Sequence, residues 1–251
     1  MELVRAEHKD GIAILKLNKG VINALDLQFL DELGDSVCRA RDDSDVHGIV
    51  LTGSNNKFFS MGFDIPQLLG FTRKNLEVFY RTFNRVCMDL YTLSKPTVAA
   101  ITGHAVAGGC ILALCCDYRF IAEGKRLMGL NEIRLGLPVP YPGECILRQV
   151  VGERYAREIM YTGEFYRPEK SFRLGLVDRV LPVKKVLSMS INKAESIGVL
   201  SYEAFGMIKH NRVEAVEAQI RKHLTQRQEF YLDCWFSEKA HELLTEMAKK
   251  F

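Results

Sequence analysis

The sequence lacks the features that mark membrane-spanning and secreted proteins. Its longest apolar run, around Cys110 to Cys116, is about half of the 18 or more residues that a bilayer-spanning helix needs. The N-terminal stretch MELVRAEHKDG carries charges from its second residue and has no apolar signal-peptide core. We therefore expect a cytoplasmic protein, or one of a similar compartment, with no membrane partner.

The chain also lacks a disulfide pattern and a strong charge of one sign. Its 7 cysteines include the adjacent pair Cys115 and Cys116, and an odd count with such a pair indicates reduced thiols. No CxxC pair occurs, so we expect Cys110 and this pair to be buried as small apolar side chains, and we predict no metal site. The net charge of +3, from 34 basic and 31 acidic residues, gives no electrostatic reason to expect a nucleic-acid partner.

Strand-like and helix-like patterns alternate along most of the chain. Short apolar runs at 47–52, 97–101 and 118–122 are typical of buried strands. Amphipathic patterns at 27–40 and 72–94 are typical of helices; the first precedes the run at 47–52, and the second lies between the runs at 47–52 and 97–101. This alternation predicts an α/β domain built from strand–helix–strand units with right-handed crossovers.

The pattern changes after residue 182. Residues 1–182 contain the alternating elements, whereas residues 183–251 contain helical spacing and no evident strand. We therefore expect an α/β core over 1–182 and a smaller helical subdomain over 183–251. No linker rich in proline, glycine or serine separates the two parts, which predicts that they pack as one unit.

Three motifs stand out by their order and separation. They are KFFSMGFDI at 57–65, GHAVAGGCILA at 103–113 and MGLNEIRLG at 128–136. Together they resemble the crotonase superfamily, the enoyl-CoA hydratase and isomerase family, over nearly the whole chain. The resemblance implies a crotonase-like ββα spiral core, an acyl-CoA thioester substrate, and homotrimers formed by the helical subdomain and paired into hexamers. Coenzyme A is part of that substrate, so no separate cofactor is expected.

The resemblance also implies an oxyanion hole for the thioester carbonyl. An enolate oxygen needs preorganised donors, and backbone N–H groups of a glycine-rich turn can approach it closely. Gly108 matches one of the family's two donors, and Met61 is taken as the other. We expect the residues around them to contact substrate: Lys57, Ser60, Gly62, Phe63, Asp64, Ile65, Gly109 and Ile111. For Asp64, a helix-capping role is the competing interpretation.

Glu132 stands where the family carries a catalytic carboxylate. Hydratases of the family typically use a second glutamate, and in its position this chain has Ile111, which cannot bind a proton. A single base suits a different reaction, because it can remove a proton from C2 of a 3-enoyl-CoA and return it at C4. The stretch LNE that ends at Glu132 also resembles mitochondrial-type Δ3,Δ2-enoyl-CoA isomerases, which is the activity we expect.

Two alternatives stay open at this point. A hydratase, or another crotonase-type lyase or hydrolase, would use Glu132 together with Glu144, although Glu144 also suits a favourable acid in a first helical turn. A non-catalytic or RNA-binding relative on the same fold is the other, since fold does not determine function. The three intact motifs and the absence of a basic run argue against it.

Basic and apolar residues suggest where coenzyme A and a neighbouring subunit would bind. Lys57 and Arg73 are candidates for the CoA phosphates, together with Lys249 and Lys250 at the C-terminal end. The C-terminal helices also carry an apolar group with little chain left to cover it. We expect this group to be buried against the body or a neighbouring subunit: Trp235, Phe236, Leu243, Leu244 and Met247.

Overall fold

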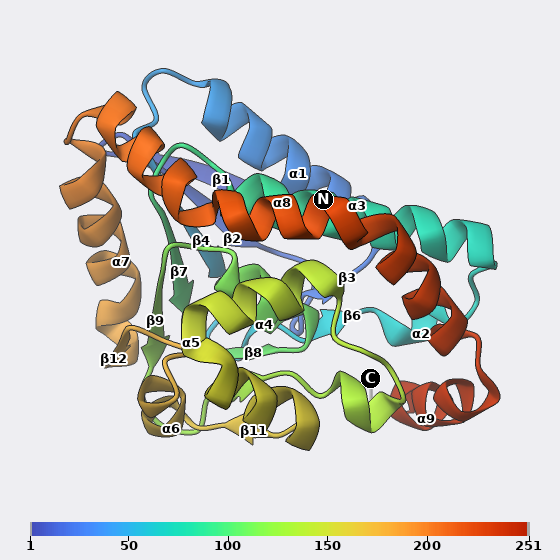
Figure 1. Ribbon diagram of the computed structural model, residues 1–251. Coiled ribbons are helices and arrows are strands. Elements are labelled where there is room, and N and C mark those ends of the chain that lie inside the picture. The colour runs from blue at the N-terminus through green and yellow to red at the C-terminus, as the bar shows by residue number, and fades with distance from the viewer. Residues whose placement is uncertain (1, 250–251) are drawn as a thin grey trace.

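The main sheet has six strands. The computed structural model describes residues 2–249, and Figure 1 shows how their elements are arranged. The strand order is β1-β2-β4-β7-β9-β12; β1 is antiparallel to β2, and every other neighbouring pair is parallel. The strands are Val4–Lys9 (β1), Ile12–Leu17 (β2), Gly48–Gly53 (β4), Thr97–Ile101 (β7), Tyr118–Ala122 (β9) and Arg179–Leu181 (β12).

Short strands form two smaller sheets that the sequence pattern does not predict. Four lie in the order β11-β10-β8-β5, and β3 pairs with β6. After β4, β7 and β9 the chain adds a strand to a smaller sheet and then a helix, so ββα units repeat as a spiral. The predicted α/β class and ββα spiral are confirmed. The strands are Ala24–Leu25 (β3), Phe58–Ser60 (β5), Gly62–Phe63 (β6), His104–Val106 (β8), Met128–Gly129 (β10) and Phe165–Tyr166 (β11).

Some of the helices begin at side-chain caps that the sequence supplies. The Asp26 carboxylate accepts the Phe29 N–H at 2.8 Å and caps α1, and Thr72 caps α3. Gly152 takes φ 75° inside α5 and kinks it. The helices are Leu27–Asp42 (α1), Ile65–Leu68 (α2), Arg73–Tyr91 (α3), Gly108–Leu114 (α4), the 3-10 helix Glu132–Leu135 (η1), Tyr141–Thr162 (α5), Pro168–Arg173 (α6), Val183–Gly198 (α7), Tyr202–Trp235 (α8) and Glu238–Ala248 (α9).

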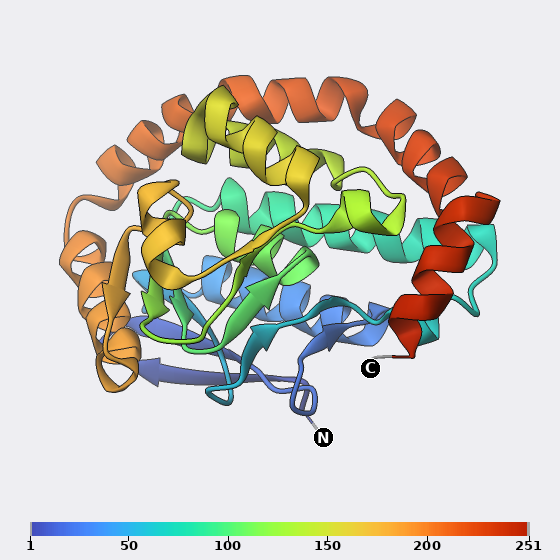
Figure 2. The same ribbon diagram turned by 90° about the horizontal axis from the view of Figure 1, so that it is seen from below.

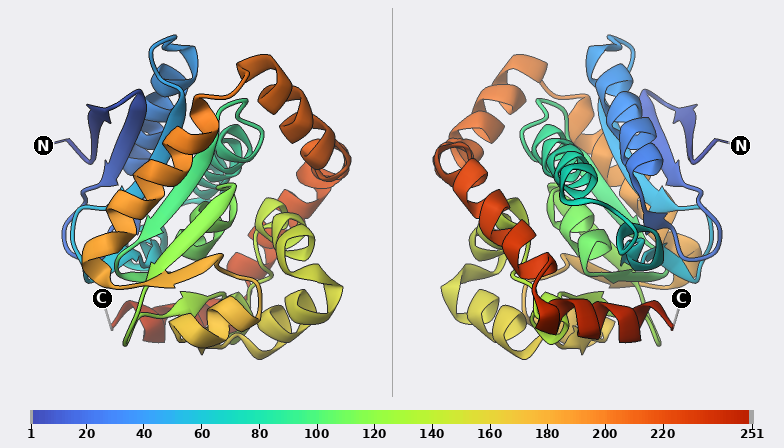
Figure 3. Two further views of the ribbon diagram at one scale, coloured as in Figure 1. Left: turned by 90° about the vertical axis from the view of Figure 1, so that its left-hand side faces the viewer. Right: turned by 90° about the vertical axis from the view of Figure 1, so that its right-hand side faces the viewer.

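Helices cover both faces of the main sheet. Helix α7 lies across one face, as Figure 3 shows, and buries Val186, Ile191 and Ala194 against β2, β4, β7 and β9. The other face meets the larger core, to which α1 and α3 contribute Leu33 and Phe83. Because the central strands are buried on both faces, their residues are mostly apolar, which explains their hydrophobic runs.

The C-terminal helices share the core of the α/β part. Figure 2 shows α8 as a long arc along one side of the molecule, with α9 turning back from its end. Helix α8 packs on α3 and α5, and α9 packs on α2 and η1. Residues 183–249 contain no strand, as the sequence predicts, while a boundary at residue 182 stays a prediction. Trp235 and Leu244 belong to the same buried cluster as the sheet.

Two groups of ion pairs hold α8 in place. Arg73 at the start of α3 pairs with Glu229 at 2.9 Å and with Asp233 at 2.8 Å. Near the other end, the buried Lys209 ammonium lies 2.7 Å from the Asp117 carboxylate, which follows α4. Removing one partner of a buried pair leaves an uncompensated charge, so the second pair firmly ties α8 to the sheet. Arg73, a candidate for the CoA phosphates, is therefore engaged within the chain.

Candidate active site

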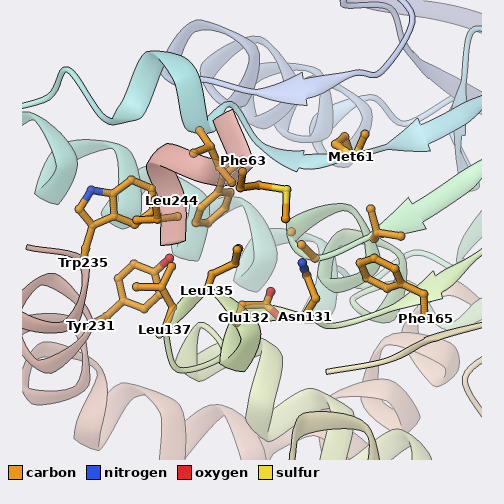
Figure 4. A pocket seen from close by; sticks show the side chains of 15 residues that line it. Met61, Phe63, Asn131, Glu132, Leu135, Leu137, Phe165, Tyr231, Trp235 and Leu244 are labelled. Carbon is orange, nitrogen blue, oxygen red and sulfur yellow. The ribbon is translucent and has the colours of Figure 1, made fainter. Parts of the chain in front are cut away.

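An apolar cavity of about 100 Å³ lies where the short strands meet the C-terminal helices. In Figure 4, Asn131 and Phe165 lie towards one end, Tyr231 and Trp235 lie at the other, and Glu132 is between them. The wall is assembled from segments that are far apart in the sequence. Its residues are Met61, Phe63, Ile65, Val106, Ala107, Gly108, Asn131, Glu132, Leu135, Leu137, Phe165, Tyr231, Trp235, Leu244 and Met247.

Glu132 is the one carboxylate among these lining residues. It begins η1 and is only 5% exposed. Burial raises its pKa from 4.5 to about 7, against the smaller lowering effect of the Glu132 and Asn131 backbone N–H groups. Its Oε2 atom has no hydrogen-bond partner within residues 2–249. A carboxyl group with this pKa can both accept and return a proton near neutral pH.

The turn between β8 and α4 brings backbone into the cavity wall. Ala107 holds φ 49°, a conformation that non-glycine residues rarely adopt and that is often stored at functional sites. Gly108 follows it and lines the cavity. A Cβ atom on Gly109 would lie only 2.4 Å from the Ser60 carbonyl oxygen, so the first and second motifs meet backbone to backbone.

The structure contradicts the prediction that the Met61 N–H faces substrate. This N–H donates to the Ile22 carbonyl oxygen at 2.9 Å and is therefore already engaged within the protein. The Met61 side chain does line the cavity, as Figure 4 shows. The motif alone does not reveal which of its N–H groups points at a neighbouring strand, because that depends on pairing with a distant segment.

Phe63, two residues after Met61, is a further candidate for the role expected of Met61. The next residue, Asp64, donates its N–H to the Leu25 carbonyl at 2.9 Å, which lies in β3. Phe63 pairs with Leu25 in a parallel ladder whose Leu25 carbonyl accepts the Asp64 N–H, so the Phe63 N–H does not bond to β3. Phe63 lines the cavity, and a Cβ atom on Gly62 would lie 2.9 Å from the Gly108 nitrogen, so β6 and the start of α4 are in contact.

Lys19 forms ion pairs, which the sequence did not suggest, with residues next to β3 and β6 on the side away from the cavity. The Lys19 ammonium lies 2.6 Å from the Asp26 carboxylate and 3.0 Å from that of Asp64. Asp64 also caps α2, in agreement with the competing interpretation, and is absent from the cavity wall. The buried Ser60 hydroxyl donates to the Asn23 carbonyl at 2.8 Å. Asp64 and Ser60 thus brace the site and do not line it.

The candidates for CoA phosphates lie outside the cavity wall. Lys57 is exposed on the loop before β5, and Lys249 is exposed and pairs with Glu246. Lys250 lies outside the described residues. Which basic group binds a phosphate stays a prediction.

Ile111 and Glu144 are both absent from the cavity wall. Ile111 is fully buried and packs on Gly143 at the start of α5. Glu144 borders a separate groove. Its carboxylate lies 4.0 Å from Arg148, and its side chain is about one-third exposed. The second carboxylate that the hydratase alternative requires is therefore not at the cavity in this structure.

The C-terminal helices supply a part of the wall that no motif contains. Tyr231 and Trp235 come from α8, and Leu244 and Met247 come from α9. Tyr231 stacks on Tyr80 of α3, with ring centroids 4.2 Å apart. Trp235, Leu244 and Met247, which belong to the apolar group expected to be buried, therefore form part of the wall of the chain's own cavity. An apolar spacing in the sequence reveals a buried face but not what that face encloses.

Neither a metal cluster nor a membrane helix occurs among residues 2–249. No group of three histidine, cysteine or acidic side chains there is placed to hold a metal ion. Cys110, Cys115 and Cys116 are buried, and burial raises the pKa of each thiol. None of the helices in the described part of the chain combines the length and the apolar character needed to cross a membrane.

Comparison with known proteins gives the same family as the motifs. The enoyl-CoA hydratase/isomerase family profile matches residues 7–250. The chain is 33% identical to mouse mitochondrial enoyl-CoA delta isomerase 1 over 196 residues, 78% of this chain and 66% of that protein. It is 32% identical to crotonyl-CoA hydratase of Syntrophomonas wolfei over 187 residues, 74% of this chain and 72% of that protein. The match thus spans slightly less than two thirds of the mouse protein.

The fold comparison extends over almost the whole chain. The crystal structure of human mitochondrial delta3-delta2-enoyl-CoA isomerase superposes with a TM-score of 0.95, covers 99% of this chain and 97% of that chain, and is 25% identical in sequence. Profile, relatives and fold agree with the family that the three motifs indicate. The chain belongs to the enoyl-CoA hydratase/isomerase family.

Proposed function

We propose that the protein is a Δ3,Δ2-enoyl-CoA isomerase in which Glu132 alone carries the proton. The observation that supports this most strongly is a cavity lined by one carboxylate. Hydration requires a water activated for attack and a proton delivered to the neighbouring carbon, a task suited to two carboxylates. This cavity has no second carboxylate among its lining residues, because position 111 is isoleucine and Glu144 lies outside the wall.

The chemistry follows from the position of the double bond in the substrate. In a 3-enoyl-CoA the C2 proton lies between the thioester and the alkene, so its removal gives a conjugated dienolate. The Glu132 carboxylate takes this proton, and the electron pair moves towards the thioester oxygen. The protonated carboxyl then returns the proton at C4, which leaves a 2-enoyl-CoA. A pKa of about 7 matches both halves of this exchange.

The dienolate oxygen needs two fixed donors, for which we propose the N–H groups of Phe63 and Gly108. Both residues line the cavity, and their segments are in contact at Gly62. Backbone donors suit this task because they are held rigidly and do not titrate. In a crystal structure with bound hexanoyl-CoA, the thioester oxygen should lie roughly 2.7–3.1 Å from both nitrogens. An oxygen placed at Met61 instead would contradict the assignment.

A paired assay separates the isomerase from the other candidates. With 3-hexenoyl-CoA we expect a rise in the absorbance of the conjugated enoyl thioester. With crotonyl-CoA we expect no fall in that absorbance, because hydration would be absent. Rapid loss of crotonyl-CoA absorbance would favour a hydratase, and inactivity on both with measurable RNA binding would favour a non-catalytic relative.

For the assembly we propose a homotrimer, with pairing into hexamers as the larger form. Support comes from a group of apolar side chains, each more than half exposed, in the turn after α7 and the first two turns of α8. Exposed patches of this kind mark contact surfaces, and a monomeric mass in light scattering at micromolar concentration would reject the proposal. The residues are Val199, Leu200, Tyr202, Met207 and Ile208.

A further inference from the structure

We infer that the cavity accepts short acyl chains of about four to six carbons, and that Trp235 determines this limit. The inference rests on the proposed function in one respect, namely that the ligands are acyl-CoA thioesters. It adds which chain lengths bind and which residue is responsible. Trp235 is proposed as a specificity residue that touches the far end of the acyl chain and takes no part in proton transfer.

The size of the cavity gives the chain length. Its volume is about 100 Å³. An apolar cavity of roughly 150 Å³ holds one benzene molecule, so this one has room for about four carbons before side chains adjust. We allow for small side-chain movements that would admit about two more carbons, because a packed protein interior deforms only slightly.

The two ends of the cavity differ in character, which orients the ligand. Asn131, Phe165 and Met247 also border a second groove that contains the charged side chains of Arg134 and Glu164. The opposite end, at Tyr231 and Trp235, is lined by side chains that are at most 2% exposed. Polar coenzyme A belongs at the groove, and the acyl chain belongs at the buried end.

The buried end cannot easily move aside for a longer chain. Tyr231 is stacked on Tyr80, and Trp235 lies one helical turn further along α8, with its ring centroid 6.4 Å from that of Tyr231. The same stretch of α8 packs against α3 through this stacking, and the exposed pairs of Arg73 with Glu229 and Asp233 lie beside it. An acyl chain that grows past this point meets a packed aromatic wall, and overpacking such a wall is unfavourable.

The unmodified protein offers a direct binding test, because Trp235 is its only tryptophan. We would titrate the protein with acetyl-, butanoyl-, hexanoyl- and decanoyl-CoA and follow tryptophan fluorescence. Acetyl-CoA should leave the emission nearly unchanged, whereas hexanoyl-CoA should shift it, because only the longer chain reaches the indole. Calorimetric dissociation constants should fall by about fourfold per added CH₂ up to hexanoyl-CoA. They should rise by at least about tenfold for decanoyl-CoA.

Variants then test whether Trp235 is responsible. Trp235→Leu should tighten decanoyl-CoA binding by at least about tenfold and leave acetyl-CoA binding nearly unchanged. Phe230→Leu is the matched control, since Phe230 lies on the same helix, is 57% exposed and is absent from the cavity wall. Should Trp235→Leu fold poorly by circular dichroism, Trp235→Phe should give a smaller shift in the same direction.

The outcomes separate this inference from the proposed function. Decanoyl-CoA that binds the unmodified protein as tightly as hexanoyl-CoA would overturn the length limit, whatever the isomerase assay shows. Equal chain-length profiles for Trp235→Leu and Phe230→Leu would overturn the role of Trp235. Binding is measured with saturated thioesters, which cannot react, so a failed isomerase assay would leave the binding test intact.

Discussion

Ile111 rests directly on the backbone of Gly143, where a Cβ atom would lie 2.8 Å from the Ile111 Cδ1 atom. Helices α4 and α5 therefore meet at this point with no space for a side chain on the glycine. By resemblance to the family, position 111 is where hydratases typically carry a second glutamate. In this chain its side chain joins two helices.

This contact predicts coupled effects on stability. Gly143→Ala should lower the free energy of unfolding by about 1–3 kcal/mol through overpacking. Ile111→Ala should lower it by about 2–5 kcal/mol through a cavity. In the double variant the new methyl group enters the vacated space. Its loss of unfolding free energy should therefore be at least about 0.5 kcal/mol smaller than the sum of the two single losses. Urea denaturation of the four proteins measures this, and strict additivity would refute the contact.

The same contact predicts that Ile111→Glu does not create a hydratase. The new carboxylate would lie against Gly143 and away from the cavity wall, in a buried apolar slot that disfavours its charge. We expect a less stable protein whose hydration of crotonyl-CoA stays at background in a spectrophotometric assay. Hydration well above background would mean that side chains at 111 reach the substrate.

Glu132→Gln should lower isomerase turnover by at least about 10²-fold, because it removes the base while keeping the side-chain shape. Hexanoyl-CoA affinity, measured by calorimetry, should change little. Glu144→Gln is the comparison, and we expect less than about 10-fold loss because Glu144 lies outside the cavity. The reverse order of effects would identify Glu144 as the base.

The raised pKa of Glu132 predicts how activity depends on pH. The base must be ionised to take a proton, so kcat/KM should rise with pH up to about 7 and then level off. A profile that is flat between pH 5 and 8 would argue against a carboxyl group whose pKa is about 7.

Stability should follow the opposite trend in the same pH range. The folded protein holds the Glu132 proton more tightly than the unfolded chain, so this group stabilises the fold fully below pH 4.5 and loses its contribution as pH rises to about 7. The loss amounts to about 3 kcal/mol at 1.4 kcal/mol per pKa unit. Glu132→Gln should remove it, so the variant should be more stable than the parent above pH 7 by chemical denaturation.

Lys19→Met should destabilise the support behind the cavity. It would leave the Asp26 and Asp64 carboxylates near each other without their shared cation, at an expected cost of about 1–3 kcal/mol. Lys16→Met is the control, because Lys16 pairs with the exposed Glu7 on the surface and should cost less than about 0.5 kcal/mol. Thermal unfolding of both variants checks this. Equal losses of stability would show that the Lys19 ion pairs contribute no more than the surface pair of Lys16.

Local features of the sequence were enough for the main strands, several helices and the choice of Glu132 as the carboxylate proposed to be the base. The apolar runs at 97–101 and 118–122 are strands in the structure, and Asp26 is the cap of α1, as predicted. Glu132 was recognised from its motif and lies buried in the cavity. Such features are local because they depend on side-chain spacing and on the nearest backbone groups.

Contacts between distant segments decided the rest. Contacts with Ile22 and Leu25 engage the N–H groups of Met61 and Asp64, and no single segment contains that information. The return of α8 and α9 made Trp235 and Leu244 part of the cavity wall, where the sequence showed only an apolar face. The sequence by itself determined which groups are available for chemistry. The tertiary structure decided which of them face the same cavity, because direction and burial arise only when the elements pack together.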